Sequence, residues 1–401
     1  MVSVLIKIFG LTNIELAEDI VQDTLLKAME QWKLNGVPDN PSAWLMTVAK
    51  NKTLDLLRHK KLEKKYVEKI TPLLQSEYTL GYTLNNYFSE DAIKDDLLRM
   101  MFVCCHPGIT EESSIALILK TLCGFSIGEI ARAFHSTESN INKRLYRAKE
   151  KFRNSEIKFE LPTNTEINFR INSVLKALYL LFNKAYSSAS VDNLIREDLA
   201  AEAVRLCLLL SQHASGNNPA VHALLALMFF HGARFNSRVD EDGNLLLLNK
   251  QDRGLWDPDL IQEGIRELNL PSTGIELSVY HIEAFIALEH CIAETYEQTN
   301  WNNILQYYNS LYRINQSPVI ALNRAIIIAE ISGPDEALME INKIENIKEM
   351  ENYYLLPAAI GDLLFRKNDK TNAKKYFEQA SALTASPTEK KFLNKRIKDC
   401  I

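Results

Sequence analysis

Apolar residues recur at helical spacing along most of the chain, and residues 126–153 show this most clearly. Ser126 with Glu129 has the pattern of a capping box, so a helix is predicted to begin there. A short polar stretch, residues 135–137, separates it from a second predicted helix. The inner face of that second helix is formed by Ile141, Leu145, Ala148 and Phe152. The pattern therefore predicts two helices joined by a tight turn.

The outer face of the second helix is polar and basic, carrying Ser139, Asn140, Lys143, Arg144 and Arg147. Two such helices form a helix-turn-helix, whose second helix enters the major groove of DNA. The turn of this motif often has glycine where His135 stands, because φ is often positive there. Two amphipathic helices of an all-α core with a solvated basic face remain an alternative interpretation.

Two further helices are predicted near the N-terminus, over residues 14–32 and 41–59. Thr12 with Glu15 resembles a second capping box, and Asn40 before Pro41 marks the start of the later helix. The first helix has Ile14, Ala17, Val21, Leu25, Ala28 and Met29 on its apolar side. Its other side is acidic and is either solvated or meets a basic partner.

The helix over residues 41–59 carries Trp44 and a basic polar side with Lys50, Asn51, Lys52 and Arg58. A loop of turn residues beside such a helix suits single-stranded nucleic acid, because aromatic side chains stack on unpaired bases while cations follow the backbone. Trp44 is equally compatible with a place in the core.

The rest of the chain also reads as helices. Linkers are expected over 61–93 and 154–165, with helices at 95–105 and 111–123 between them. Further helices are expected at 171–185, 196–212, 219–233, 257–268 and 279–299. After about residue 300, Gly361, Ala373, Phe377 and Ala380 stand at tetratricopeptide offsets. The prediction is an all-α chain with domains at 1–60, 94–155, 166–290 and 291–401.

Composition and charge agree with that fold class and sharpen the candidate chemistry. Apolar residues make up 46% of the 401 residues, enough for real cores. The net charge of −5 argues against the whole chain being a nucleic-acid binder, but residues 50–69 and 143–153 are locally basic. Two basic patches suit a phosphate backbone.

Other kinds of site are not indicated. The six cysteines form no C-x-x-C pair, which fits a reducing cytoplasm, and Cys104 and Cys105 lack a second ligand cluster for a metal. The sequence contains no P-loop, GxGxxG, G-x-S-x-G or HExxH motif, so we expect neither catalysis nor a cofactor. The apolar opening is too short to span a membrane and is interrupted by Lys7.

Residues 17–24, A-E-D-I-V-Q-D-T, resemble a segment of region 2 in bacterial sigma factors of the extracytoplasmic-function class. Residues 41–58, from P-S-A-W-L to D-L-L-R, resemble the following helix of that region. The resemblance implies that the first segment binds the clamp helices of the polymerase β′ subunit, and that the second helix and its preceding loop read and open the −10 element. The implied polymerase-binding residues are Glu18, Asp19, Gln22 and Asp23.

Residues 130–134 and 141–148 resemble region 4 of the same family, whose second helix lies in the major groove at the −35 element. Together the two resemblances cover about residues 1–155, in the family's order. The candidate DNA-binding residues are Asn40, Trp44, Lys50, Asn51, Lys52, Arg58, Lys60, Lys61, Asn140, Asn142, Lys143, Arg144, Arg147, Lys149 and Lys151.

Residues 104–107, 178–186 and 252–257 resemble a subgroup of these sigma factors that carries a large helical extension ending in tetratricopeptide-like repeats. The chain departs from the subgroup pattern at Lys184, Ala185 and Gly254. Members usually have a longer first helix in region 2, so the shorter one here is expected to reflect a late start or a truncation.

The resulting prediction is a cytoplasmic, non-enzymatic sigma factor that binds the β′ and β subunits of core RNA polymerase and promoter DNA, and is regulated by its C-terminal extension. An anti-sigma factor is compatible with the sequence, but nothing indicates one. A peptide-responsive repressor with a helix-turn-helix and tetratricopeptide repeats is the main alternative. A protein-binding scaffold is a third hypothesis.

Overall fold

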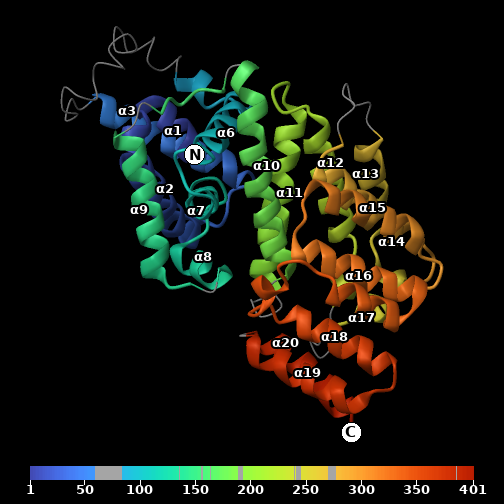
Figure 1. Ribbon diagram of the computed structural model, residues 1–401. Helices are drawn as coiled ribbons and strands as arrows, with labels where there is room; N and C mark the ends of the chain where they lie inside the picture. The colour runs from blue at the N-terminus through green and yellow to red at the C-terminus, as the bar shows by residue number, and fades with distance from the viewer. Residues whose placement is uncertain are drawn as a thin grey trace. The chain divides into compact units, whose positions relative to one another are not determined.

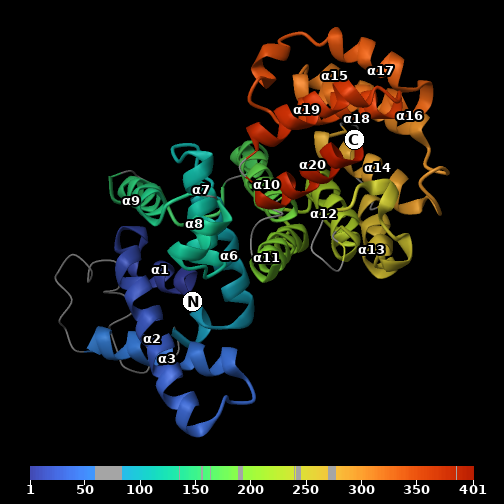
Figure 2. The ribbon, with the colours of Figure 1, turned by 90° about the horizontal axis from the view of Figure 1, so that it is seen from below.

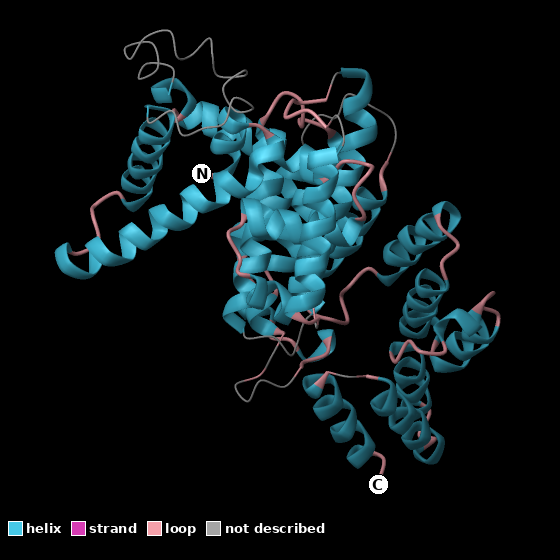
Figure 3. Cartoon of the chain, turned by 90° about the vertical axis from the view of Figure 1, so that its left-hand side faces the viewer, coloured by secondary structure: helices cyan, strands magenta, loops and turns pink. Residues whose placement is uncertain are grey.

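The computed structural model describes residues 1–58, 84–134, 136–154, 157–162, 164–187, 193–238, 240, 245–269, 277–384 and 386–401. Across these ranges the regular secondary structure consists of helices, as Figure 3 shows by colour, so the all-α prediction is confirmed. The chain divides into two compact units, residues 1–181 and 182–401. The boundary falls inside helix α10 (Asn164–Ser187).

The first unit begins with three helices, α1 (Val2–Phe9), α2 (Ile14–Asn35) and α3 (Pro41–Arg58), drawn in blue in Figures 1 and 2. Helix α1 is at the centre of this unit, since Val4, Leu5 and Ile6 are fully buried and it contacts both α2 and α6 (Glu90–Cys104). A 3₁₀ turn, Leu11–Asn13, leads into α2, whose N-cap is Asn13. The predicted capping box of Thr12 and Glu15 is therefore wrong, because Thr12 lies within that turn.

A buried ion pair fastens α1 to α6. Asp96 has no exposed surface, and its carboxylate lies 3.3 Å from the ammonium of Lys7 and also pairs with Arg99. Burial raises the pKa of Asp96, and the two cations act in the opposite direction. Helix α6 begins five residues before the predicted start at Asp95, at Glu90.

The second half of the first unit contains the predicted helix pair. Helix α7 (Glu111–Leu117) runs into a π-helical turn, Ile118–Leu122, and then come α8 (Ile127–Ala133) and α9 (Glu138–Asn154). The capping box that begins α8 is confirmed, because the Ser126 hydroxyl accepts from the Glu129 N–H and the Glu129 carboxylate accepts from the Ser126 N–H. Thr137 caps α9 by accepting from the Asn140 N–H. His135, the predicted departure from the motif, lies outside the described residues.

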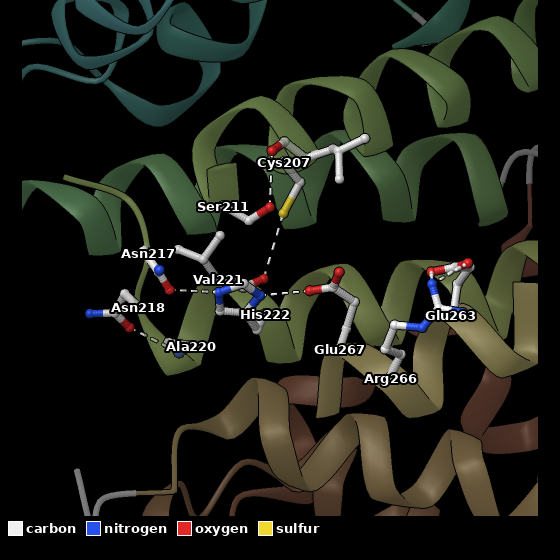
Figure 4. Close-up of polar contacts among 11 residues, drawn as sticks. Cys207, Ser211, Asn217, Asn218, Ala220, Val221, His222, Glu263, Arg266 and Glu267 are labelled. Carbon is white, nitrogen blue, oxygen red and sulfur yellow. Dashed lines mark hydrogen bonds and ion pairs between the residues drawn. The ribbon is translucent and has the colours of Figure 1, made fainter. Parts of the chain in front are cut away.

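The second unit continues with α11 (Asn193–Gln212), α12 (Pro219–Gly232), α13 (Pro258–Leu268) and α14 (Val279–Ile292). Helix α12 is the buried centre of this group, and Gly264 of α13 allows close packing because a Cβ there would lie 2.5 Å from the ring of Phe230. His222 of α12 forms two hydrogen bonds, which Figure 4 shows. Its Nδ1 lies 2.6 Å from the Glu267 carboxylate, and its Nε2 lies 2.9 Å from the side-chain oxygen of Asn217. The predicted helix 279–299 ends earlier, at Ile292.

The segment between α12 and α13 is held by two arginines that both contact the ring of one tryptophan. Arg234 and Arg253 place their guanidinium carbons 5.1 Å and 4.8 Å from the ring of Trp256, which is 5% exposed. Arg253 also donates to the carbonyls of His290 and Ala293 and to the Thr299 hydroxyl. Arg253 therefore ties the segment between α12 and α13 to the end of α14 and to the turn that follows it.

The chain ends in helices packed on their neighbours, α15 (Trp301–Ile314), α16 (Pro318–Ser332), α17 (Pro334–Asn342), α18 (Leu355–Arg366), α19 (Lys370–Leu383) and α20 (Pro387–Asp399). A Cβ at Gly361 would lie 2.9 Å from the ring of Phe377, so this glycine lets α18 and α19 approach closely. The remaining 3₁₀ turns are Phe235–Ser237, Leu248–Lys250, Arg253–Leu255 and Ile347–Met350.

Candidate nucleic-acid interface

Helix α9 is buried on one side and open on the other. Its inner face, Ile141, Leu145, Ala148 and Phe152, is at most 4% exposed and packs against α7 and α8. This confirms the inner face predicted from spacing. The predicted DNA contacts on the opposite side are exposed at Asn140, Asn142, Lys143, Arg147 and Lys151, and half-buried at Arg144 and Lys149. Helix α9 thus presents a continuous polar and basic face that a DNA groove can accept.

The half-burial of Arg144 has a specific cause. Its guanidinium lies 3.2 Å from the carboxylate of Glu112, at the start of α7. The two side chains belong to the walls of a groove of about 690 Å³ between residues 108–113 and α9. The ion pair with Glu112 therefore occupies one nitrogen of this guanidinium.

Tyr146 is a candidate that the sequence reasoning missed. Its side chain is 60% exposed on α9, beside Asn142, Lys143 and Arg147, and the guanidinium of Arg153 lies over its ring at 5.6 Å. An exposed aromatic ring among cations can contact sugar or base surfaces. The available signal was helical spacing, since residue 146 follows Lys143 by three and Ser139 by seven.

The structure joins one predicted phosphate contact to one predicted polymerase contact. The Lys149 ammonium donates to Oε2 of Glu18 at 2.6 Å, and these side chains are only 15% and 17% exposed. Arg153 adds a second pair with Glu15 at 3.3 Å. The C-terminal half of α9 therefore packs at the start of α2.

The other predicted polymerase-binding residues, Asp19, Gln22 and Asp23, are exposed on α2. The prediction that Leu25 and Met29 lie on the buried side of this helix is wrong, because they are 44% and 71% exposed. The buried side instead consists of Ile14, Ala17, Ile20, Thr24 and Ala28. The acidic face of α2 therefore continues into an exposed apolar surface, to which Leu26 also belongs at 57% exposure.

Several of the predicted DNA-binding side chains at helix α3 already have partners within the protein. Asn40 caps the helix by accepting from the Ala43 N–H at 3.0 Å, Lys50 donates to Asn85, and Lys52 pairs with Asp23 at 3.1 Å. Asn51 is exposed. Lys60, Lys61 and the side chain of Arg58 lie outside the described residues.

Trp44 is half-buried, so neither of its two interpretations is eliminated. Its ring meets that of Trp32 edge to face, with centroids 5.5 Å apart and planes at 61°. Such a pair contributes packing energy and also leaves part of the Trp44 ring accessible.

Other ionisable clusters have structural partners. Cys104 and Cys105 are buried, and burial raises the pKa of the Cys104 thiol to about 12. His281 accepts from the Ser278 N–H at the start of α14, and His290 packs edge to face on Trp301. Among the described residues, no three His, Cys, Asp or Glu side chains gather as metal ligands, and no helix is long and apolar enough to cross a membrane.

Known protein families match this chain in three successive segments. Residues 2–63 match sigma-70 region 2, residues 99–152 match sigma-70 region 4, and residues 170–271 match a family of unknown function, DUF6596. The fold and these matches define the class: the first part of the chain consists of the two regions of a sigma-70-type protein.

The chain as a whole belongs to the family that contains the uncharacterized protein R00370 of Rhizobium meliloti (strain 1021), to which it is 31% identical over 387 residues, covering 96% of this chain and 90% of the relative. It is also 28% identical to the ferric citrate uptake sigma factor FecI of Escherichia coli over 134 residues, 33% of this chain and 72% of FecI. A probable RNA polymerase sigma factor of Haemophilus influenzae is 25% identical over 157 residues, 35% of this chain and 76% of the relative. No solved structure matches the chain.

Proposed function

We propose that this chain is a sigma factor that binds core RNA polymerase in the cytoplasm and directs transcription initiation. Helix α9 lies in the −35 major groove, while α3 and the loop before it act at the −10 element. Helix α2 binds the β′ clamp helices, and region 4 meets the β subunit. The observation that carries this proposal is the open basic face of α9 above a fully buried inner face, in a region 4 that follows a region 2.

We assign base contacts to Asn140, Lys143, Arg144 and Arg147, because side chains of these types read base edges in the major groove. Lys149 and Lys151 near the end of α9 are assigned to phosphates, which position the protein without specifying sequence. Asn142 stays a candidate for either role. In region 2 we keep Asn40, Trp44, Lys50, Asn51, Lys52 and Arg58, with Lys60 and Lys61, as candidates at the −10 element.

The test is reconstitution. The purified chain is mixed with core polymerase, and we expect the two to co-elute and to produce transcripts from promoter fragments selected for binding to the mixture. A repressor of the helix-turn-helix type would instead bind DNA alone as a dimer and give no promoter-dependent transcript. A scaffold would do neither, so failure to co-elute and to transcribe would refute the proposal.

The regulatory role of the C-terminal unit is the second part of the proposal. Helix α10 must stay in a truncated protein, because Arg170 donates to the Phe102 carbonyl at 2.6 Å and Lys176 pairs with Glu111 within the first unit. A chain ending after Ser187 keeps both contacts. We expect it to lose transcription relative to the full chain, and equal activity of the two would remove the regulatory role.

A further inference from the structure

Helix α20 and residues 245–250 form the walls of a groove of about 800 Å³ in the C-terminal unit. Its apolar part is made by Leu245, Leu246, Leu247 and Phe392. Leu247 is 45% exposed, and the other three are half-buried. This apolar surface is therefore open to a partner.

The apolar wall is fixed by its backbone. The Leu246 N–H donates to the Arg238 carbonyl at 2.9 Å, and the Gln251 amide donates to the Leu246 carbonyl at 3.2 Å. The Leu247 carbonyl accepts from the Lys250 N–H at 2.8 Å. Because both polar groups of Leu246 are used, the wall is preorganised and a ligand does not have to order it.

The rim of the groove carries more cations than carboxylates, since five lysines and Arg396 stand in its lining against Asp240 and Asp399. Lys391, Lys395 and Lys398 lie at spacings of four and three along α20, so they stand on one side of the helix. Like charges at such spacings destabilise a helix, and an anionic partner beside Lys395 and Lys398 offsets that cost. Lys250 and Lys390 add two further cations to the same lining.

Three of these lysines, Lys390, Lys395 and Lys398, differ from the neighbouring arginine. Arg396 pairs with Asp362 and Asp399 and lies over the rings of Phe365 and Phe377, so its charge is engaged within the unit. Among the residues that the structure describes, Lys390, Lys395 and Lys398 form no ion pair. Their charge is available to a ligand.

We propose that this groove binds an acidic peptide segment of a partner protein that also carries leucine-like side chains. The cationic rim supplies charge complementarity, and the leucine wall supplies an apolar contact that a phosphate backbone cannot use. Nucleic acid is therefore the disfavoured ligand. This inference goes beyond the proposed sigma-factor function and does not require it.

The probe is a fluorescein-labelled peptide of three Asp-Glu-Leu-Leu repeats, titrated with the full chain and followed by fluorescence anisotropy. Two peptides of the same length replace either the acids by lysine or the leucines by serine. A labelled duplex DNA of unrelated sequence is the fourth ligand. Of the four ligands, we expect only the acidic leucine peptide to bind tightly. Added salt should weaken this binding, because the rim charges are exposed.

Matched variants locate the site. Lys395→Glu with Lys398→Glu is expected to weaken binding about tenfold or more, and Leu247→Ser about tenfold, because each removes one of the two contacts. Lys375→Glu, at an exposed residue of α19 outside the groove, is expected to change affinity less than about twofold. Circular dichroism checks that each variant stays folded.

The proposal is overturned if the serine peptide binds as well as the leucine peptide, which would make the surface a bare cationic patch. It is also overturned if duplex DNA binds more tightly and competes for the same lysines. If Lys375→Glu lowers the affinity for the peptide as much as the groove variants do, the peptide does not bind in the groove. Co-elution with polymerase reports the sigma-factor function separately, so the two failures are distinguishable.

Discussion

Lys149 of region 4 donates a hydrogen bond to Glu18 of region 2 at 2.6 Å, across 131 residues of sequence. The same ammonium is a proposed phosphate contact, and the same carboxylate is a proposed polymerase contact. Neither side chain can fill its proposed role while the pair is closed. We therefore expect binding to polymerase and promoter to separate α9 from the start of α2.

The first prediction measures this pair. Lys149→Met is expected to lower the free energy of unfolding by about 1–3 kcal/mol, because it leaves the mostly buried Glu18 carboxylate without its cation. The charge swap Glu18→Lys with Lys149→Glu should recover part of that loss. Urea-induced unfolding is the measurement. Lys176→Met, at an ion pair more than half exposed, is the control and should cost less than about 1 kcal/mol.

The second prediction concerns the ion pair between Glu112 and Arg144. Arg144→Ala should cost about 1–3 kcal/mol of discrimination between promoter and unrelated DNA, if this guanidinium makes a bidentate base contact. Glu112→Gln should strengthen promoter binding, because it frees Arg144 and removes a negative charge near the phosphates. Lys151→Ala should weaken binding to all sequences alike and reduce the salt slope by about one. Holoenzyme binding to DNA at several salt concentrations separates these outcomes, and uniform losses for Arg144→Ala would contradict base reading.

The third prediction concerns the exposed face of α2. Asp19→Lys should abolish co-elution with core polymerase, and Met29→Ala should weaken it about tenfold, because a large exposed apolar side chain beside an acidic face suits a protein interface. Asp19 is a cleaner choice than Asp23, which is paired with Lys52. Gln31→Lys, on another side of the same helix, is the control. Unchanged co-elution of Asp19→Lys would move the interface away from α2.

Helical spacing predicted the inner face of α9 correctly because this face is covered by packed neighbours, namely α7, α8 and the 3₁₀ turn Leu11–Asn13 before α2. The same reasoning failed at Leu25 and Met29. Spacing identifies which residues share a side of a helix, but it does not say where the covering element stops. Thr24 and Ala28, in the same part of α2, are buried, so cover reaches this level of the helix; Leu25 and Met29 lie at the edge of the covered side and stay exposed.

Contacts between distant parts of the chain could not be predicted from the sequence, and the reason is different. The charges of Lys149, Arg153, Glu15 and Glu18 were visible, yet nothing local distinguishes a solvated surface charge from one paired across the fold. Asp96 is a similar case, since it stands among exposed-looking charges on α6 but is fully buried against Lys7. Local signals such as the Ser126 capping box were predictable because both partners lie within one turn of a helix.

The fourth prediction concerns pH and two buried histidines, His231 and His290. Burial and the nearby Arg234 lower both pKa values to about 3, below the unfolded value of about 6.5. The unfolded chain therefore takes up protons that the folded unit refuses, and stability present above pH 6.5 is lost as the pH falls toward 3. At pH 5 the loss is about 2 kcal/mol for each histidine. His290→Gln should remove about half of this pH dependence in urea unfolding between pH 7 and 5, and an unchanged slope would contradict it.

The last prediction concerns Arg253, which clamps residues 252–257 to the segment after α14. Arg253→Lys should lower the free energy of unfolding of the C-terminal unit by about 2–4 kcal/mol, because a lysine cannot reach two carbonyls and a hydroxyl at once and also stack on Trp256. Gly254→Ser, at the residue next to Arg253, is the matched control. A Cβ there would lie 3.1 Å from Oδ1 of Asp252, which the serine side chain can accommodate by a small shift, so the change should be within about 1 kcal/mol. Tryptophan fluorescence follows the unfolding of both variants, with Trp256 and Trp301 reporting on this unit and Trp32 and Trp44 on the first. If lysine is tolerated as well as serine, the two carbonyl contacts of Arg253 do not stabilise the unit.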